Sequence, residues 1–472
     1  MKRFRRITML CAFIVLGVVL LNACDGQSGR QEAEDSSEGE LTAEIILKEN
    51  ESKTEEKNMD MNNENSITET LPVKEEATDE FFDTLTELDE KLGKRYMSTI
   101  MTSFISTGNT YRLRTALDRA KAGEEITVAF IGGSVTEGAL ATEKTPKGYQ
   151  KGYAYLTYEY LCRNYSTGDN IKLVSSGVSG TSSFLGIVRS DVDVLDYKPD
   201  IIFVEFAVNN GDSPQDKQSF ESLLRKFLNA DNAPAVVLLF SDATYAGGTQ
   251  VYMEMMGAYY SLPMMSMHDA LQHATSTGTI EWNDYSNDYA HPTQDGHRLY
   301  AKCICYLINT AYAEKSDTSY EVKEKPSANG NDKYENAVIL DNTDAAGMIV
   351  TTGSFEAKET SFFSTGNSDT TALHKGWVRA AGSSNEDFVI QAECRNFSIV
   401  VRQLGGTEAS VDVYVDGSFV KKINTNQEGA WNNSATELLI DEETARMHEI
   451  RIRATEGSED KEQMILAMCY SK

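Results

Sequence analysis

The chain has 472 residues, 40% of them hydrophobic, and a formal net charge of −28 at pH 7. This length leaves room for two or three domains of roughly 100–200 residues each, and the apolar content is sufficient for folded cores. A polyanion repels nucleic acid and anionic lipid headgroups, so the composition argues against both as binding partners.

The first 23 residues predict a bacterial lipoprotein signal peptide. A basic start, Lys2–Arg6, precedes an apolar run over residues 7–21, which is shorter than the roughly 20 residues of a membrane-spanning helix. The run ends in Leu21-Asn22-Ala23-Cys24, which resembles the lipobox and implies cleavage before Cys24 and lipid attachment to its thiol. We therefore expect an extracytoplasmic protein anchored to the bacterial cell membrane. An ordinary signal peptide or an uncleaved anchor with an incidental cysteine is the alternative.

Residues 24–80 predict a disordered acidic tether. From Asp25 to Glu80 the sequence has no aromatic residue and is rich in Glu, Asn, Ser, Thr and Lys. Such a segment buries too little apolar surface to offset chain entropy; a specific interaction tail is the alternative. Order is expected from Phe81, where apolar residues at helical spacing predict an amphipathic helix. A second helix is predicted over Tyr111–Ala122, ending at Gly123.

Residues 81–314 predict one α/β domain. Five short apolar runs lack the alternation of half-exposed strands and therefore predict strands buried on both faces. They cover residues 126–131, 171–175, 200–206, 235–240 and 262–267. Helical patterns cover residues 153–163, 186–195, 218–228, 251–260 and 296–311. This alternation predicts a parallel sheet with helices on both faces.

Residues 315–334 predict a polar linker, and residues 335–472 predict an all-β accessory domain. The strand candidates are residues 388–391, 397–402, 410–415, 418–423 and 448–453. The pair Asp416-Gly417 predicts a hairpin turn between two of them. Short strands and turns without a helical period are typical of a compact β-sandwich.

Four polar segments accompany the ends of these elements. They are Gly132-Gly133-Ser134, Gly177-Val178-Ser179-Gly180-Thr181-Ser182, Val204-Glu205-Phe206-Ala207-Val208-Asn209-Asn210 and Asp288-Tyr289-Ala290-His291-Pro292. Catalytic sites of open α/β sheets lie at the carboxyl ends of the strands. A serine hydroxyl is a weak nucleophile until a base removes its proton, and a histidine near an aspartate can supply that base. The segments therefore predict a serine hydrolase.

Together the four segments, over roughly residues 107–313, resemble the SGNH/GDSL hydrolase family. The resemblance implies a three-layer α/β/α, flavodoxin-like domain with Ser134 as nucleophile and His291 as general base and then general acid. It makes Asp288 the residue that orients His291. It assigns the oxyanion hole to the backbone N–H groups of Ser134 and Gly180 and to the side-chain amide of Asn209.

The sequence departs from the family pattern at three positions. Gly133 stands where an acidic residue is usual, Val135 where leucine is usual, and Asn210 where aspartate is more frequent. Asn210 is also the main rival of Asn209 for the assignment to the oxyanion hole.

Each site residue also has a purely structural interpretation. Ser134 can cap a helix, His291 can be a core histidine, Asp288 a solvated loop acid and Gly180 a turn glycine. Glu205 is interpreted either as support for the site or as a sheet-edge acid, whereas His297 favours a capping or packing role. Neither a dinucleotide or phosphate-binding motif nor a Cys/His metal spacing occurs in the sequence, so we expect no cofactor and no metal.

The spelling of the segments resembles the carbohydrate-esterase branch of the family, which implies removal of O-acetyl groups from polysaccharides. The expected partner is an acetylated glycan substrate; the oligomeric state is left open. Trp377, Trp431 and Tyr414 are interpreted either as sugar-stacking or as core aromatics. The alternatives are a lipase- or thioesterase-type acyl hydrolase, and a glycan-binding surface lipoprotein with a vestigial site.

Overall fold

The computed structural model describes residues 96–472, except 246–248, 316, 320–324, 329–331 and 361–367. The predicted signal peptide, the lipidation site at Cys24, the tether and the helix expected from Phe81 lie outside the described residues. Within the part that is described, no helix combines the length and the apolar character needed to cross a membrane.

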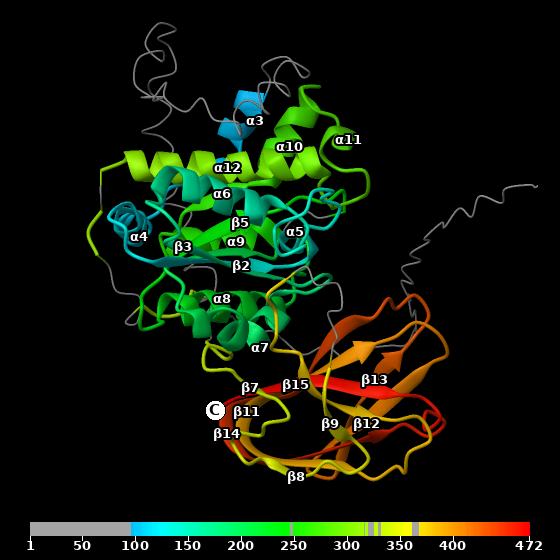
Figure 1. Ribbon diagram of the computed structural model, residues 1–472. Coiled ribbons are helices and arrows are strands. Elements are labelled where there is room, and N and C mark those ends of the chain that lie inside the picture. The colour runs from blue at the N-terminus through cyan, green and yellow to red at the C-terminus, as the bar shows by residue number, and fades with distance from the viewer. Residues whose placement is uncertain (1–95, 246–248, 316, 320–324, 329–331, 361–367) are drawn as a thin grey trace, which may run out of the picture. The chain divides into compact units, whose positions relative to one another are not determined.

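Six strands form the sheet of the α/β domain, in the order β1-β6-β5-β4-β2-β3 (Figure 1). Their bounds are β1 Phe104–Ser106, β2 Ile126–Gly132, β3 Ile171–Gly177, β4 Ile201–Glu205, β5 Ala235–Phe240 and β6 Met264–Ser266. Strands β2 to β6 pair in parallel, and β1 adds an antiparallel edge. The predicted parallel sheet is confirmed, whereas β1 was not predicted because three residues carry no readable pattern.

Helices cover both faces of this sheet. Their bounds are α3 Tyr96–Thr102, α4 Tyr111–Lys121, α5 Ser134–Glu137, α6 Tyr153–Tyr165, α7 Ser183–Asp193, α8 Pro214–Leu228, α9 Thr249–Tyr259, α10 Met267–Ser276, α11 Trp282–Tyr285 and α12 Gln294–Ala313, with a 3₁₀ turn at Leu195–Tyr197. One buried core lies under α4, α6, α10 and α12, and a second under α7, α8 and α9. Figure 1 shows α6 and α12 on one face and α7 and α8 on the other.

The strand predicted over residues 262–267 is wrong at both ends, since β6 covers only Met264–Ser266. The Ser266 hydroxyl accepts a hydrogen bond from the Asp269 backbone N–H at 2.8 Å, so that Ser266 caps α10. This cap starts a helix at Met267. A short apolar run does not reveal such a switch from strand to helix.

The second domain is an antiparallel β-sheet, which confirms the predicted all-β class. Its strands are β7 Val338–Leu340, β8 Ile349–Thr351, β9 Glu356–Glu359, β10 Lys375–Arg379, β11 Phe388–Gln403, β12 Ala409–Val415, β13 Ser418–Asn426, β14 Asn433–Ala454 and β15 Gln463–Ser471. All nine belong to one hydrogen-bonded sheet. The candidates 388–391 and 397–402 are parts of the single strand β11, which pairs with β14 through two register shifts.

A segment of the second domain, called the β domain below, is linked through α7 to the strand that leads into α5. The buried carboxylate of Asp193 accepts hydrogen bonds from the backbone N–H groups of Thr371 and Ala372 at 2.9 and 3.0 Å. The same carboxylate pairs with Arg189 at 3.3 Å, and Arg189 donates to the Gly132 carbonyl at 3.1 Å. The β domain is thus linked to the last residue of β2.

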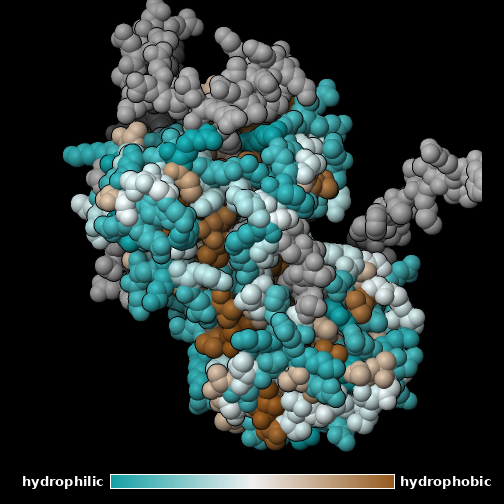
Figure 2. Space-filling model, in the orientation of Figure 1, coloured by the Kyte–Doolittle hydropathy of each residue, from teal (hydrophilic) through white to brown (hydrophobic). Residues whose placement is uncertain are grey.

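The visible face of the molecule is mostly hydrophilic, with apolar side chains gathered in a narrow band (Figure 2). Several of the large apolar side chains that are exposed are aromatic. Among them are Tyr245, Tyr289, Phe419 and Trp431, each more than half exposed. Three of these rings, Tyr245, Tyr289 and Trp431, lie next to the site described below.

Candidate active site

Ser134 stands at the sharp connection between β2 and the single-turn helix α5. β2 ends at Gly132, Gly133 precedes the helix, and Gly138 ends it with a φ of 91°. A left-handed residue of this kind favours glycine, which has no Cβ. The turn brings Ser134 to the carboxyl edge of the sheet, where it is 8% exposed.

The structure brings Ser134, His291 and Asp288 into one hydrogen-bonded chain. The His291 Nε2 lies 2.8 Å from the Ser134 Oγ, and its Nδ1 lies 2.7 Å from the Asp288 Oδ2. With the proton of the ring on Nδ1, where the carboxylate accepts it, Nε2 is free to accept the serine proton.

Asp288 is held as a carboxylate. Its Oδ1 accepts the backbone N–H groups of Ala290 and His291 at 2.8 and 2.7 Å. Partial burial acts to raise the pKa of Asp288. The two backbone hydrogen bonds, the hydrogen bond from the His291 ring and the charge of that ring when protonated have a larger, opposite effect, so the pKa lies below its ordinary value. An ionised Asp288 stabilises a positive charge on the imidazole.

The two predicted oxyanion donors besides Ser134 come from the strands on either side of β2. Gly180 lies in the loop between β3 and α7, and Asn209 follows β4. Gly180 has a φ of 71°, so the loop adopts a conformation that favours glycine. Because β3 and β4 flank β2 in the sheet, all three candidates meet at one edge.

The side-chain amide of Asn210 is engaged in hydrogen bonds within the fold. Its Oδ1 accepts the Ser183 backbone N–H at 2.8 Å, and its Nδ2 donates to the Ser183 Oγ and to the Tyr252 hydroxyl. Both ends of the amide are therefore engaged in fixing the start of α7. This leaves Asn209 as the asparagine that can serve an oxyanion.

Gly133 and Asn209 fit closely together. A Cβ at position 133 would lie 2.0 Å from the Asn209 Oδ1 and 3.6 Å from its Nδ2. The Asn209 side chain therefore occupies the space that a larger residue at position 133 would need. This contact accounts physically for glycine where the family usually has an acidic residue.

Two buried glutamates support the turn around Ser134. Glu137 accepts the Ser179 backbone N–H at 3.0 Å and also the Ser179 hydroxyl, which fixes the residue before Gly180. Glu205, at the end of β4, accepts a hydrogen bond from Thr136 at 3.2 Å, and burial raises the pKa of its carboxyl to about 7. Glu205 thus lies under α5, as a supporting role requires, rather than at a sheet edge.

The support by Glu137 could not be inferred from the sequence. Glu137 and Ser179 are 42 residues apart and belong to different segments. The one available signal was a glutamate three residues after the candidate nucleophile, which fits a solvated helix end equally well.

His297 is fully buried and is not part of the chain of hydrogen bonds at Ser134. Its ring bonds to the Ala139 carbonyl at 3.0 Å and to the Tyr153 backbone N–H at 3.2 Å. Burial lowers the pKa of His297 to about 4. It therefore packs as a neutral ring between α12 and the loop after α5.

No cluster of three or more His, Cys, Asp or Glu side chains suited to a metal ion occurs in the part of the chain that the structure describes. Within the described residues, Cys162, Cys303, Cys305, Cys394 and Cys469 are free thiols.

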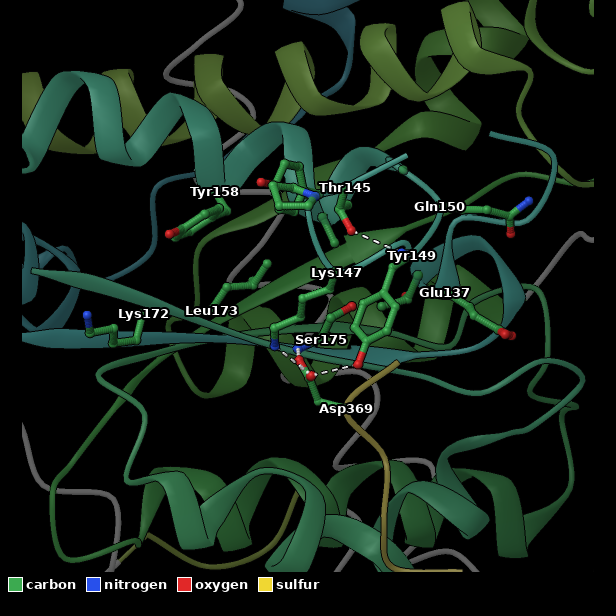
Figure 3. Close-up of a pocket in the computed structure, with 15 residues that line it drawn as sticks. Glu137, Thr145, Lys147, Tyr149, Gln150, Tyr158, Lys172, Leu173, Ser175 and Asp369 are labelled. Atoms are coloured by element: carbon green, nitrogen blue, oxygen red, sulfur yellow. Dashed lines mark hydrogen bonds and ion pairs between the residues drawn. The ribbon is translucent and has the colours of Figure 1, made fainter. Parts of the chain in front are cut away.

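A cavity of about 340 Å³ lies behind the loop that follows α5 (Figure 3). Lys147 and Tyr149 point to Asp369, which the β domain supplies, at 2.8 and 3.1 Å. Glu137 lines the cavity, but Ser134 and His291 do not. The cavity is therefore separate from the hydrogen-bonded chain at Ser134, although Thr136 and Glu137 of α5 contribute to its lining.

The three aromatic residues considered for sugar stacking differ in position. Trp377 is buried in the core of the β domain, at 1% exposure. The Tyr414 ring is covered by the Arg453 guanidinium, 4.9 Å from its centroid. Trp431, between β13 and β14, is 59% exposed, and its ring lies 3.1 Å from the position of a Cβ on Gly180. Only Trp431 of the three lies beside the candidate site.

Comparison with known proteins shows which proteins this chain is similar to. Residues 130–299 match the model of the GDSL-like lipase/acylhydrolase family. Two solved structures of a two-domain esterase (CEX) active on acetylated mannans, one co-crystallised with mannopentaose, are 24% identical, with TM-scores of 0.67 and 0.68. They cover 79% of this chain and 98% and 99% of their own. No curated protein matches the chain. Residues 130–299 are therefore similar to the GDSL-like family, and the chain shares the two-domain fold of that esterase.

Proposed function

We propose that this chain is a serine esterase that removes O-acetyl groups from carbohydrates. The observation that carries the proposal is the chain of hydrogen bonds from Ser134 through His291 to Asp288, with distances of 2.8 and 2.7 Å. A hydroxyl, an imidazole and a carboxylate in this order activate the hydroxyl as a nucleophile.

In the first half of the reaction the Ser134 Oγ attacks the acetyl carbonyl carbon while His291 Nε2 takes the serine proton. The oxyanion accepts hydrogen bonds from the N–H groups of Ser134 and Gly180 and from the Asn209 amide. When the intermediate collapses, the bond to the sugar oxygen breaks, and His291 returns its proton to that oxygen. Acetyl-Ser134 remains.

In the second half a water molecule attacks the acetyl carbon and gives a proton to His291. Collapse of this intermediate restores the Ser134 hydroxyl and releases acetate. Asp288 stays ionised throughout, because its pKa lies below the ordinary value, and it stabilises each imidazolium that forms.

Two observations support a carbohydrate as the substrate. The structurally similar two-domain esterase is active on acetylated mannans. Trp431 also exposes an aromatic ring beside Gly180, and aromatic rings with a polar edge suit the apolar faces of sugar rings.

Hydrolysis of a chromogenic acetate ester tests the reaction class. We expect the purified chain to release the chromophore and a Ser134→Ala variant to do so at least about 10³-fold more slowly. Equal rates in the two proteins would rule out a serine esterase at this site.

Release of acetate from acetylated mannan and acetylated xylan, compared with release of octanoate from an octanoate ester, tests the substrate class. A carbohydrate deacetylase prefers the acetylated polymers, whereas a lipase-type hydrolase prefers octanoate. Glycan binding without any ester hydrolysis would instead support a surface lipoprotein with a vestigial site.

We also propose that lipid attached to Cys24 anchors the protein to the outer face of the cytoplasmic membrane. The proposal rests on the basic start, the short apolar run and the Ala23-Cys24 pair. We expect the full chain expressed in a bacterium to partition into detergent and a Cys24→Ala variant to lose the lipid by mass spectrometry. An unmodified Cys24 in the mature protein would contradict it.

A further inference from the structure

Two exposed tyrosine rings lie side by side next to His291. Tyr289 is 56% exposed and Tyr245 is 61% exposed. Their ring centroids are 5.5 Å apart, and the Tyr289 centroid is 6.2 Å from that of the His291 ring. The structure therefore offers an aromatic surface directly beside the proposed general base.

The backbone around this surface is fixed by hydrogen bonds. The Thr244 N–H donates to the Tyr289 carbonyl at 2.8 Å, which joins the segment after β5 to the loop of Asp288. The Trp282 ring donates to the Asp288 carbonyl at 2.6 Å. The rings are thus exposed although the chain that carries them is held in place, so they are available to a ligand.

The chemistry of the proposed reaction defines what must lie on this side. The oxygen that leaves with the sugar must come within hydrogen-bonding distance of His291 Nε2 to receive its proton. The sugar ring bonded to that oxygen then lies on the His291 side of the acetyl carbon. The oxyanion donors face the carbonyl oxygen instead.

We propose that Tyr245 and Tyr289 form the subsite that holds the sugar ring whose acetyl group is removed. This inference rests on the proposed function. The apolar C–H face of a pyranose packs on the tyrosine rings, and the phenol hydroxyls remain at the edge, where they can bond to the sugar hydroxyls. The leaving group of a small alkyl ester has no sugar ring and therefore cannot pack on these tyrosine rings in this way.

The selectivity between two acetates tests the subsite. We expect the Tyr245→Ala/Tyr289→Ala double variant to lose roughly tenfold in the ratio of kcat/KM for an acetylated mannooligosaccharide to kcat/KM for ethyl acetate, mainly through a higher KM for the sugar. The Tyr245→Phe/Tyr289→Phe variant keeps both rings and is expected to keep this ratio within about threefold, because each phenol hydroxyl adds one hydrogen bond at most.

Phe419→Ala is the matched control, since Phe419 is also 56% exposed but lies in the β13 hairpin. It should leave the ratio as in the wild type. A double variant that loses equally on both acetates, or that keeps the ratio, overturns the subsite.

A binding measurement keeps the subsite and the proposed function separable. Unacetylated mannopentaose is titrated calorimetrically into the Ser134→Ala protein with and without the two alanine substitutions. We expect roughly tenfold weaker binding when the rings are removed. Equal affinity overturns the subsite even if ester hydrolysis is established, whereas lost affinity supports it even if the wild type hydrolyses neither acetate.

Discussion

The α/β domain contains two histidine–aspartate pairs with nearly the same geometry. The His291 Nδ1 lies 2.7 Å from the Asp288 carboxylate, and the His268 Nδ1 lies 2.7 Å from that of Asp242. Asp242 comes two residues after β5, and His268 is the second residue of α10, which directly follows β6, whereas Asp288 and His291 lie between α11 and α12. The pairs differ in the hydrogen-bond partner of the second ring nitrogen, Nε2.

His291 Nε2 meets the Ser134 hydroxyl, whereas no hydrogen bond of His268 Nε2 is recorded within the described ranges. The aspartates differ as well, because Asp242 is 1% exposed while the Asp288 side chain is 31% exposed. A histidine oriented by a carboxylate is therefore not sufficient for a hydrolytic site. The two pairs differ because only His291 has a serine hydroxyl, that of Ser134 after β2, within hydrogen-bonding distance of its Nε2.

Replacing each histidine gives the largest expected contrast. His291→Ala should lower kcat on a chromogenic acetate by about 10⁴-fold or more, because the base and the acid of the reaction are lost together. His268→Ala should stay within about threefold of the wild type, as expected for a residue outside the reaction. Steady-state kinetics of the two variants check this, and equal losses would place His268 in the reaction.

Replacing each aspartate gives a smaller contrast. Asp288→Asn should lower kcat by about 10²-fold or more, because an amide neither holds the required tautomer nor stabilises the imidazolium. Asp242→Asn should mainly lower the unfolding midpoint, since Asp242 is buried. Kinetics and denaturant unfolding are measured on both variants. A kinetic defect in Asp242→Asn as large as that in Asp288→Asn would show that the two pairs are not distinct in function.

The first pair could be predicted from the sequence, whereas the second could not. Ser134 and His291 could be predicted because four short segments resemble the SGNH/GDSL family in the same order, and the parallel strands could be predicted from apolar runs. Asp242 gave no such signal, because its partnership with His268 depends on β5 and β6 lying side by side. The fit of Gly133 to Asn209 and the link from Asp193 to the β domain likewise join segments that are distant in the sequence.

His297, which has no carboxylate partner, is expected to affect the stability of the fold at acidic pH. Burial lowers the pKa of His297 to about 4, whereas an unfolded histidine has a pKa of about 6.5. Below pH 6.5 the unfolded chain therefore binds a proton at His297 that the folded chain does not bind, so the free energy of unfolding decreases as the pH is lowered. Between pH 7 and 5 this loss amounts to about 2 kcal/mol. Denaturant unfolding at both pH values should show that His297→Gln, although less stable, loses this part of the pH dependence.

His268 should respond to pH in the opposite direction and by less. The hydrogen bond to Asp242 raises the pKa of His268 against the effect of partial burial, so the folded chain holds the proton more tightly than the unfolded chain. The resulting stabilisation is fully present below the unfolded pKa and is lost as the pH rises through the folded one. Because the His268 side chain is 29% exposed, we expect an effect on the order of 0.5 kcal/mol. Unfolding of the wild type and of His268→Gln at pH 5.5 and 9 measures it. A gap between the two proteins that widens at pH 9 would mean that Asp242 does not hold the proton on His268.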